Sequence, residues 1–163
     1  MGFLQGSGPA FDSSKGDVIF DLMSTGQTAA AWQLLSGVRE GDLPWAVYCK
    51  AYCLLLAGRC EEALPLANSA FRSLTEGVPQ KPLDPVGESL LKRMEAPGPM
   101  HPSAPSLNPT FAGLQSRWLL CLCLEGCGRT EEASQTAVPL ERLGIKPFGN
   151  EVRNRCRRWT TCF

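Results

Sequence analysis

Two six-residue stretches decide the fold: Gly58-Arg59-Cys60-Glu61-Glu62-Ala63 and Gly128-Arg129-Thr130-Glu131-Glu132-Ala133. A third, Gly26-Gln27-Thr28-Ala29-Ala30-Ala31, lies 32 residues before the first and shares its opening glycine and final alanine. Glycine has no Cβ and takes the left-handed backbone angle at which a chain reverses between helices. The alanine five residues later begins a face that must approach a neighbouring helix closely. Each stretch therefore predicts a turn between two helices.

Apolar residues at helical spacing surround these turns, whereas no two alternating β-branched runs flank a tight turn. The sequence therefore predicts an all-α fold built from antiparallel helix pairs. The expected helices are two short ones within 17–35, followed by 45–57, 60–74, 111–127 and 131–143.

Residues 77–110 interrupt this pattern, since they carry eight of the chain's 13 prolines. Fixed φ angles at this density prevent a long helix, although 86–96 can form a short one. Helix connections usually span about 2–8 residues, so 77–110 is a Pro-rich insertion. We expect a disordered linker; the alternatives are that it docks on a partner in extended form or folds back over the helices.

The recurrence of a glycine, then an alanine five residues later, at a period near 34 resembles the tetratricopeptide repeat family. The resemblance covers residues 14–76 and 111–146, in about three divergent units. The second unit fits best, with small residues at Ala51, Gly58, Ala63 and Ala70. It departs from the family at Leu54, Ala67 and Thr75, where an aromatic residue or proline is usual. The resemblance implies helix pairs stacked as a short α-solenoid.

In the register of that family, the first helix of each pair lines a concave face. The face is aromatic and apolar here rather than basic, which favours an apolar or amphipathic peptide over a terminal carboxylate. The alternative is that these side chains simply belong to the core. The resemblance implies these partner-binding residues: Phe20, Tyr48, Tyr52, Trp118 and Leu122. It places Met23, Trp45 and Gln115 on the same face.

The charge of the chain is unevenly distributed. Sixteen basic and sixteen acidic side chains give a formal net charge of zero, yet residues 142–163 hold six basic and one acidic side chain. We expect a flexible leader over 1–16, a helical domain over 17–146 and a basic tail over 147–163. The tail is the one part suited to RNA or an acidic partner. Its candidate binding residues are Arg153, Arg155, Arg157 and Arg158.

No catalytic or cofactor motif occurs, and the single histidine, His101, is a poor base for a cysteine nucleophile. We expect no enzyme, no cofactor and no metal. Eight cysteines are better explained as reduced, packed thiols. The alternative is a four-thiolate zinc site from Cys49, Cys53, Cys123 and Cys127.

No apolar run reaches membrane-spanning length and no secretory signal pattern occurs, so we predict the cytoplasm, with the nucleus as the alternative. The predicted function is a non-catalytic adaptor or scaffold that binds a partner peptide or helix, alone or within a larger complex. The alternative is a small helical protein that contacts RNA or an acidic surface through its tail.

Overall fold

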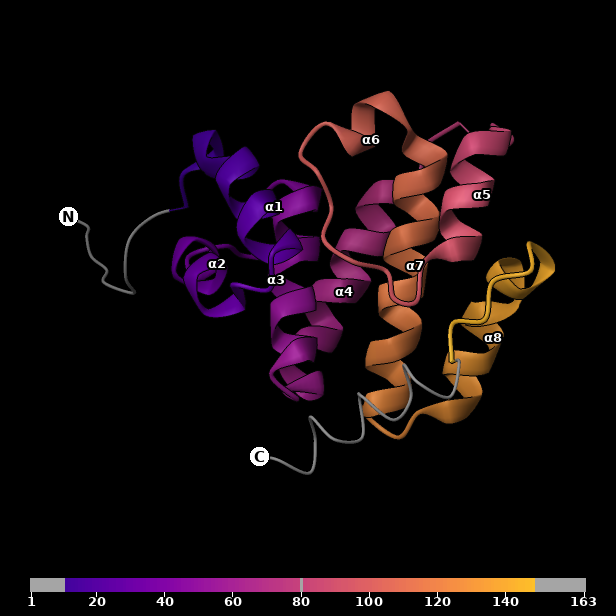
Figure 1. The fold of residues 1–163 in the computed structure, drawn as a ribbon. Helices are drawn as coiled ribbons and strands as arrows, with labels where there is room; N and C mark the ends of the chain where they lie inside the picture. Colours follow the sequence, from indigo (N-terminus) through magenta and orange to yellow (C-terminus); the bar gives the residue numbers. More distant parts are fainter. Residues whose placement is uncertain (1–10, 80, 149–163) are drawn as a thin grey trace.

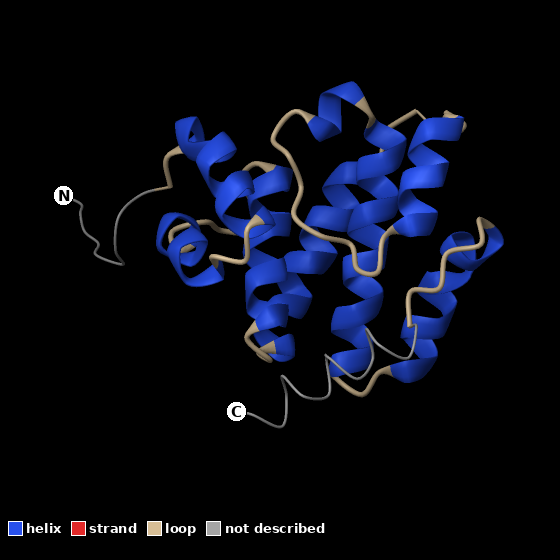
Figure 2. Ribbon diagram, in the orientation of Figure 1, coloured by secondary structure: helices blue, strands red, loops and turns tan. Residues whose placement is uncertain are grey.

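A computed structural model describes residues 11–79 and 81–148, and all regular structure in these residues is helical (Figures 1 and 2). The all-α prediction is therefore confirmed. The elements are a 3-10 turn η2 (Ser13–Lys15) and the helices α1 (Gly16–Ser24), α2 (Thr28–Leu35), α3 (Pro44–Leu56), α4 (Cys60–Thr75), α5 (Pro85–Arg93), α6 (Ala104–Leu107), α7 (Pro109–Gly126) and α8 (Thr130–Arg142).

The three motif glycines form turns of the same geometry. Gly26, Gly58 and Gly128 have φ angles of 81°, 76° and 79°, and the residue after each has a ψ of 60° to 62°. In each turn the amide after the glycine donates back to a leucine carbonyl of the preceding helix. These bonds join Gln27 to Leu22 (2.8 Å), Arg59 to Leu54 (2.9 Å) and Arg129 to Leu124 (2.9 Å).

The alanine that follows each turn is fully buried. Ala31, Ala63 and Ala133 have no exposed surface, as expected where a methyl group alone separates two helices. In α4 and α8 the first turn is also tied by an ion pair, Arg59–Glu62 and Arg129–Glu132. These exposed pairs add little stability, because water and salt screen the attraction between their charges. The repeat is therefore held by the turns and by close helix packing.

The helices pack in the order α1, α2, α3, α4, α7 and α8, each against the next (Figure 1). The insertion leaves this series after α4 and returns to it at α7, so α4 packs directly on α7. One continuous apolar core runs through the array. The first helices of the three pairs, α1, α3 and α7, form what is here called the inner face. This face holds the candidate site.

The insertion is structured, which corrects the expectation of a disordered linker. The Asp84 side chain accepts a hydrogen bond from the Gly87 amide (2.6 Å) and caps α5. Asn108 caps α7 in the same way through the Phe111 amide. Between α5 and α6 the chain folds back over the inner face and buries Met100 (Figure 1). Of the two alternatives for this segment, the structure has the one in which it folds back over the helices.

Part of the expected leader, residues 11–16, lies within the described part of the chain. The ring of Phe11 lies 5.7 Å from that of Trp45 in an edge-on contact, and Asp12 caps η2 through the Ser14 amide. Residues 11–16 thus pack on the helical domain. Residues 1–10 lie outside the described part of the chain.

Candidate peptide groove

The inner face gathers the side chains that the sequence assigned to it, but they do not line an open groove. Tyr48 on α3 and Trp118 and Leu122 on α7 are 0%, 1% and 2% exposed. Phe20 on α1 and Tyr52 on α3 are half-buried. Residues 96–102, here called the inner segment, lie against Tyr48 and Phe20 on this face.

Side-chain donors from two helices hold the inner segment by its backbone carbonyls. The Tyr48 hydroxyl donates to the Gly98 carbonyl at 2.6 Å. The Gln115 carboxamide donates to the carbonyls of Pro97 (2.7 Å) and Pro99 (2.9 Å), and lies 3.4 Å from that of Gly98. The buried Cys49 thiol lies 3.4 Å from the Met100 carbonyl, within the range of a weak sulfur hydrogen bond.

The far end of the inner segment rests on α1. His101 Nε2 lies 3.1 Å from a carboxylate oxygen of Asp17, and the His101 ring meets the Phe20 ring edge-on at 5.1 Å. Gly16, at the start of α1, lies directly under the Pro102 ring. The inner segment thus contacts the first helix of every pair, crossing from α7 over α3 to α1.

Trp118 and Tyr48 have partners outside the inner segment. The Trp118 indole donates to the Pro147 carbonyl at 3.3 Å, so it anchors the chain after α8. The Tyr48 and Tyr52 rings stack with centroids 6.4 Å apart. Trp118 is therefore buried in the core of this structure.

Burial fixes the protonation of the donors. Desolvation raises the pKa of Tyr48 well above its ordinary value, with smaller contributions from neighbouring Tyr52 and the thiols. Burial likewise raises the pKa of Cys49 to about 12. Both groups stay protonated at neutral pH and keep the hydrogen that they donate to the inner segment.

Sequence reasoning missed Cys49 and Asp17 as contacts of this face. Cys49 was counted among the packing thiols, and its position next to Tyr48 on α3 was the available signal. Asp17 lies one turn before Phe20 on α1, and nothing in the sequence pairs it with His101. Both contacts depend on the path of the insertion, which helical periodicity does not predict.

Four other thiols of the described residues have the chemistry of packed side chains. Burial raises the pKa of Cys53 and Cys121 to about 12 and moves those of Cys60 and Cys127 in the same direction. A thiol with a raised pKa is a weak nucleophile and a weak metal ligand. In residues 11–79 and 81–148, no three Cys, His, Asp or Glu side chains gather as a metal site would require. This counts against the four-cysteine zinc alternative.

Two further expectations concern the ends of the chain and membranes. The tail residues Arg153, Arg155, Arg157 and Arg158 lie outside the described residues. Within the described part of the chain, no helix combines the length and apolar character needed to cross a bilayer.

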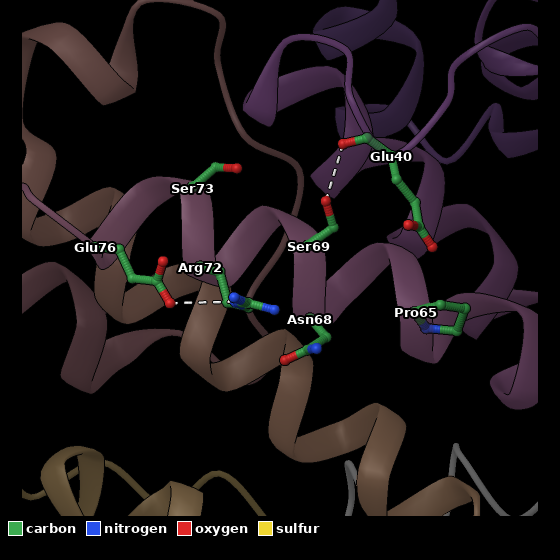
Figure 3. A pocket seen from close by; sticks show the side chains of 7 residues that line it. All are labelled: Glu40, Pro65, Asn68, Ser69, Arg72, Ser73 and Glu76. Atoms are coloured by element: carbon green, nitrogen blue, oxygen red, sulfur yellow. Dashed lines mark hydrogen bonds and ion pairs between the residues drawn. The ribbon is translucent and has the colours of Figure 1, made fainter.

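The outer face carries a polar hollow of about 470 Å³ along α4 (Figure 3). Its charged and hydroxyl groups pair locally: Arg72 Nε lies 3.1 Å from Glu76, and the Ser69 hydroxyl donates to the Glu40 carbonyl at 2.9 Å. Both members of the ion pair are more than 60% exposed. The hollow is therefore a solvated helix surface, and the inner face remains the better candidate site.

Comparisons of the chain with protein-family models, with curated proteins and with solved structures found no match.

Proposed function

We propose that this protein is a non-catalytic protein-binding module of tetratricopeptide-like helix pairs, whose inner face takes an extended peptide segment from a partner. The three turns with one geometry and the stacking of α3, α4, α7 and α8 support a repeat array. Such arrays commonly bind extended ligands on the concave side.

The single observation that carries the proposal is the inner segment itself. It lies across α7, α3 and α1, and four of its backbone carbonyls face side-chain donors, as those of a bound peptide would. Every peptide has backbone carbonyls, so a segment of another chain can meet the same donors when its side chains fit the buried positions of Pro97 and Met100. In this proposal the inner segment is an internal ligand that a partner segment replaces.

Internal occupancy sets the affinity required of a partner. A tethered segment competes at an effective concentration of the order of millimolar, without any loss of translational freedom. The apparent affinity for a partner is then the intrinsic affinity multiplied by the fraction of molecules in which the groove is open. Removal of the inner segment is therefore expected to increase binding.

The test uses the full chain in two forms: the natural sequence, and a released chain in which residues 96–102 are replaced by glycine and serine at equal length. A labelled peptide with the sequence of residues 94–103 is titrated into each, and fluorescence anisotropy reports binding. We expect saturable binding to the released chain and at least about tenfold weaker binding to the natural one.

Two variants of the released chain serve as a matched pair. Gln115→Glu places a carboxylate opposite the peptide carbonyls and should abolish binding, whereas Gln33→Glu adds the same charge at an exposed position and should not. A released chain that keeps its helical circular dichroism but binds no peptide would overturn the proposed function.

The basic tail supports a second candidate function, contact with RNA or an acidic protein surface. The observation behind it is the six-to-one excess of basic over acidic side chains in residues 142–163. Such binding weakens steeply with salt because it releases counterions. Deleting residues 151–163 should remove any salt-dependent RNA binding. If the full and the shortened chains bind RNA equally, the tail is not the RNA-binding site.

A further inference from the structure

Four consecutive carbonyls of the inner segment, from Pro97 to Met100, face buried side chains that offer hydrogens. The donors are the hydroxyl of Tyr48, the carboxamide of Gln115 and the thiol of Cys49. All three donor side chains are at least 97% buried. This part of the inner face is therefore a row of donors that meets a row of acceptors.

The four residues from Pro97 to Met100 match such a surface because two of them lack a backbone donor. Pro97 and Pro99 have no N–H group, so their backbone brings acceptors without donors. Pro97 is fully buried, whereas Pro99 is half-buried. Because position 97 is fully buried, an ordinary residue there would bring an N–H group into the interior, and a buried donor that finds no acceptor is costly.

Gly98, between the two prolines, has a φ of 70°, in the left-handed region. This conformation lets the carbonyls on both sides of it reach one carboxamide nitrogen, that of Gln115. A residue with a Cβ is strained at this angle, most of all a β-branched one. The turn therefore requires glycine or a residue that tolerates the left-handed region.

Met100 completes the pattern, since its side chain is 1% exposed and packs in the apolar core. An unbranched thioether fills an irregular apolar space better than a branched side chain. The occupant of this part of the face thus has one buried apolar anchor, two residues after the glycine.

We propose that the inner face selects extended partner segments of the form Pro-Gly-Pro followed by an unbranched apolar residue. Its side chains donate hydrogen bonds to the backbone carbonyls of such a segment, and an N–H group at the proline positions is disfavoured. This inference rests on the proposed function and names the kind of sequence that the proposed groove prefers. The position of Pro97 dominates the selectivity, since it is the more deeply buried proline.

The test uses the released chain and peptides that differ from residues 94–103 at one position. Replacing Pro97 by alanine should weaken binding about tenfold or more, while N-methylalanine, which also lacks the N–H, should restore it to within about threefold. The alanine exchange at Pro99 should have a smaller effect, and Gly98→Val should weaken binding at least tenfold. Equal binding of the Pro97 and alanine peptides would overturn the inference.

A second measurement examines the same selectivity inside the natural chain and does not depend on binding in trans. Pro97→Ala should lower the melting temperature by roughly 5 °C more than Pro82→Ala, a control at an exposed extended position that loses the same ring constraint. Equal losses would overturn the inference. If no peptide binds the released chain but the two variants still differ, the proposed function fails while the selectivity for proline stands as a property of the internal segment.

Discussion

The Tyr48 hydroxyl lies 2.6 Å from the Gly98 carbonyl oxygen, although 50 residues separate the two along the chain. This bond joins the centre of α3 to the centre of the inner segment. It also explains why a tyrosine is buried with no exposed surface: its polar atom has a partner, which buried hydroxyls require.

Removing this hydroxyl should therefore destabilise the protein. Tyr48→Phe keeps the ring and its packing but withdraws the main donor to Gly98, and we expect the free energy of unfolding to fall by about 1–2 kcal/mol. Urea unfolding followed by circular dichroism measures the change. An unchanged midpoint would mean that the bond contributes nothing to stability.

Gln115 should be more sensitive still. Gln115→Glu would replace a carboxamide donor by a carboxylate that faces the carbonyls of Pro97 and Pro99, an arrangement of acceptors alone. We expect a loss of at least about 3 kcal/mol, since a buried charge is left unpaired. Gln33→Glu, on the exposed side of α2, should stay within about 0.5 kcal/mol of the natural chain in the same unfolding experiment.

The repeated turns yield a prediction with a matched control. Gly128 has a φ of 79° and open space around the position of a Cβ, so Gly128→Ala tests backbone strain alone. We expect a loss of about 1–2 kcal/mol. Gly41 is equally open but lacks the left-handed angle, and Gly41→Ala should be neutral or slightly stabilising. Similar effects at both positions would refute the role of the turn geometry.

A methyl group at Gly16 should loosen one end of the inner segment. A Cβ there would overlap the Pro102 ring and crowd the Trp45 side chain, so Gly16→Ala must shift their contact. We expect faster cleavage after Glu95 by a glutamate-specific protease than in Gly41→Ala, with cleavage elsewhere unchanged. Equal digestion of the two variants would show that α1 does not restrain the segment.

Alkaline pH should destabilise the chain through its buried thiols. Cys49, Cys53 and Cys121 have folded-state pKa values raised from 9.0 to about 12, so above pH 9 the unfolded chain ionises and the folded chain does not. The stability that these neutral thiols contribute is present below pH 9 and is lost as the pH rises. Each thiol lowers the free energy of unfolding by up to roughly 1.4 kcal/mol per pH unit.

Urea unfolding between pH 8 and pH 10 measures this slope. Cys121→Ala removes one of the three groups and should make the slope shallower. A free energy of unfolding that stays constant over this range in the natural chain would contradict the assignment of these thiols as buried and neutral.

The helices were predictable because their signals are local. The spacing from Gly58 to Ala63 and from Gly128 to Ala133 indicates the turns and the buried faces, and the structure has both. Even the weakest copy, from Gly26 to Ala31, has the same backbone geometry, since a left-handed glycine and a small residue suffice for it.

The occupancy of the inner face was not predictable in this way. Family register placed Tyr48 and Gln115 on one face, yet what they contact is decided by the path of a proline-rich segment with no helical period. Proline density was interpreted as disorder, whereas here prolines remove backbone donors from a buried site. A composition rule cannot distinguish these two uses, because the difference lies in the Tyr48 and Gln115 donors.

The separation of Tyr48 from its partner has a consequence for synthesis on the ribosome. Translation proceeds from the N-terminus at about 5–20 residues per second, so α3 emerges several seconds before residues 97–100 and α7. During that interval the Tyr48 hydroxyl and the Cys49 thiol are without the carbonyl partners that they have in the folded chain. The contacts that close the inner face therefore form only after the insertion has been synthesised.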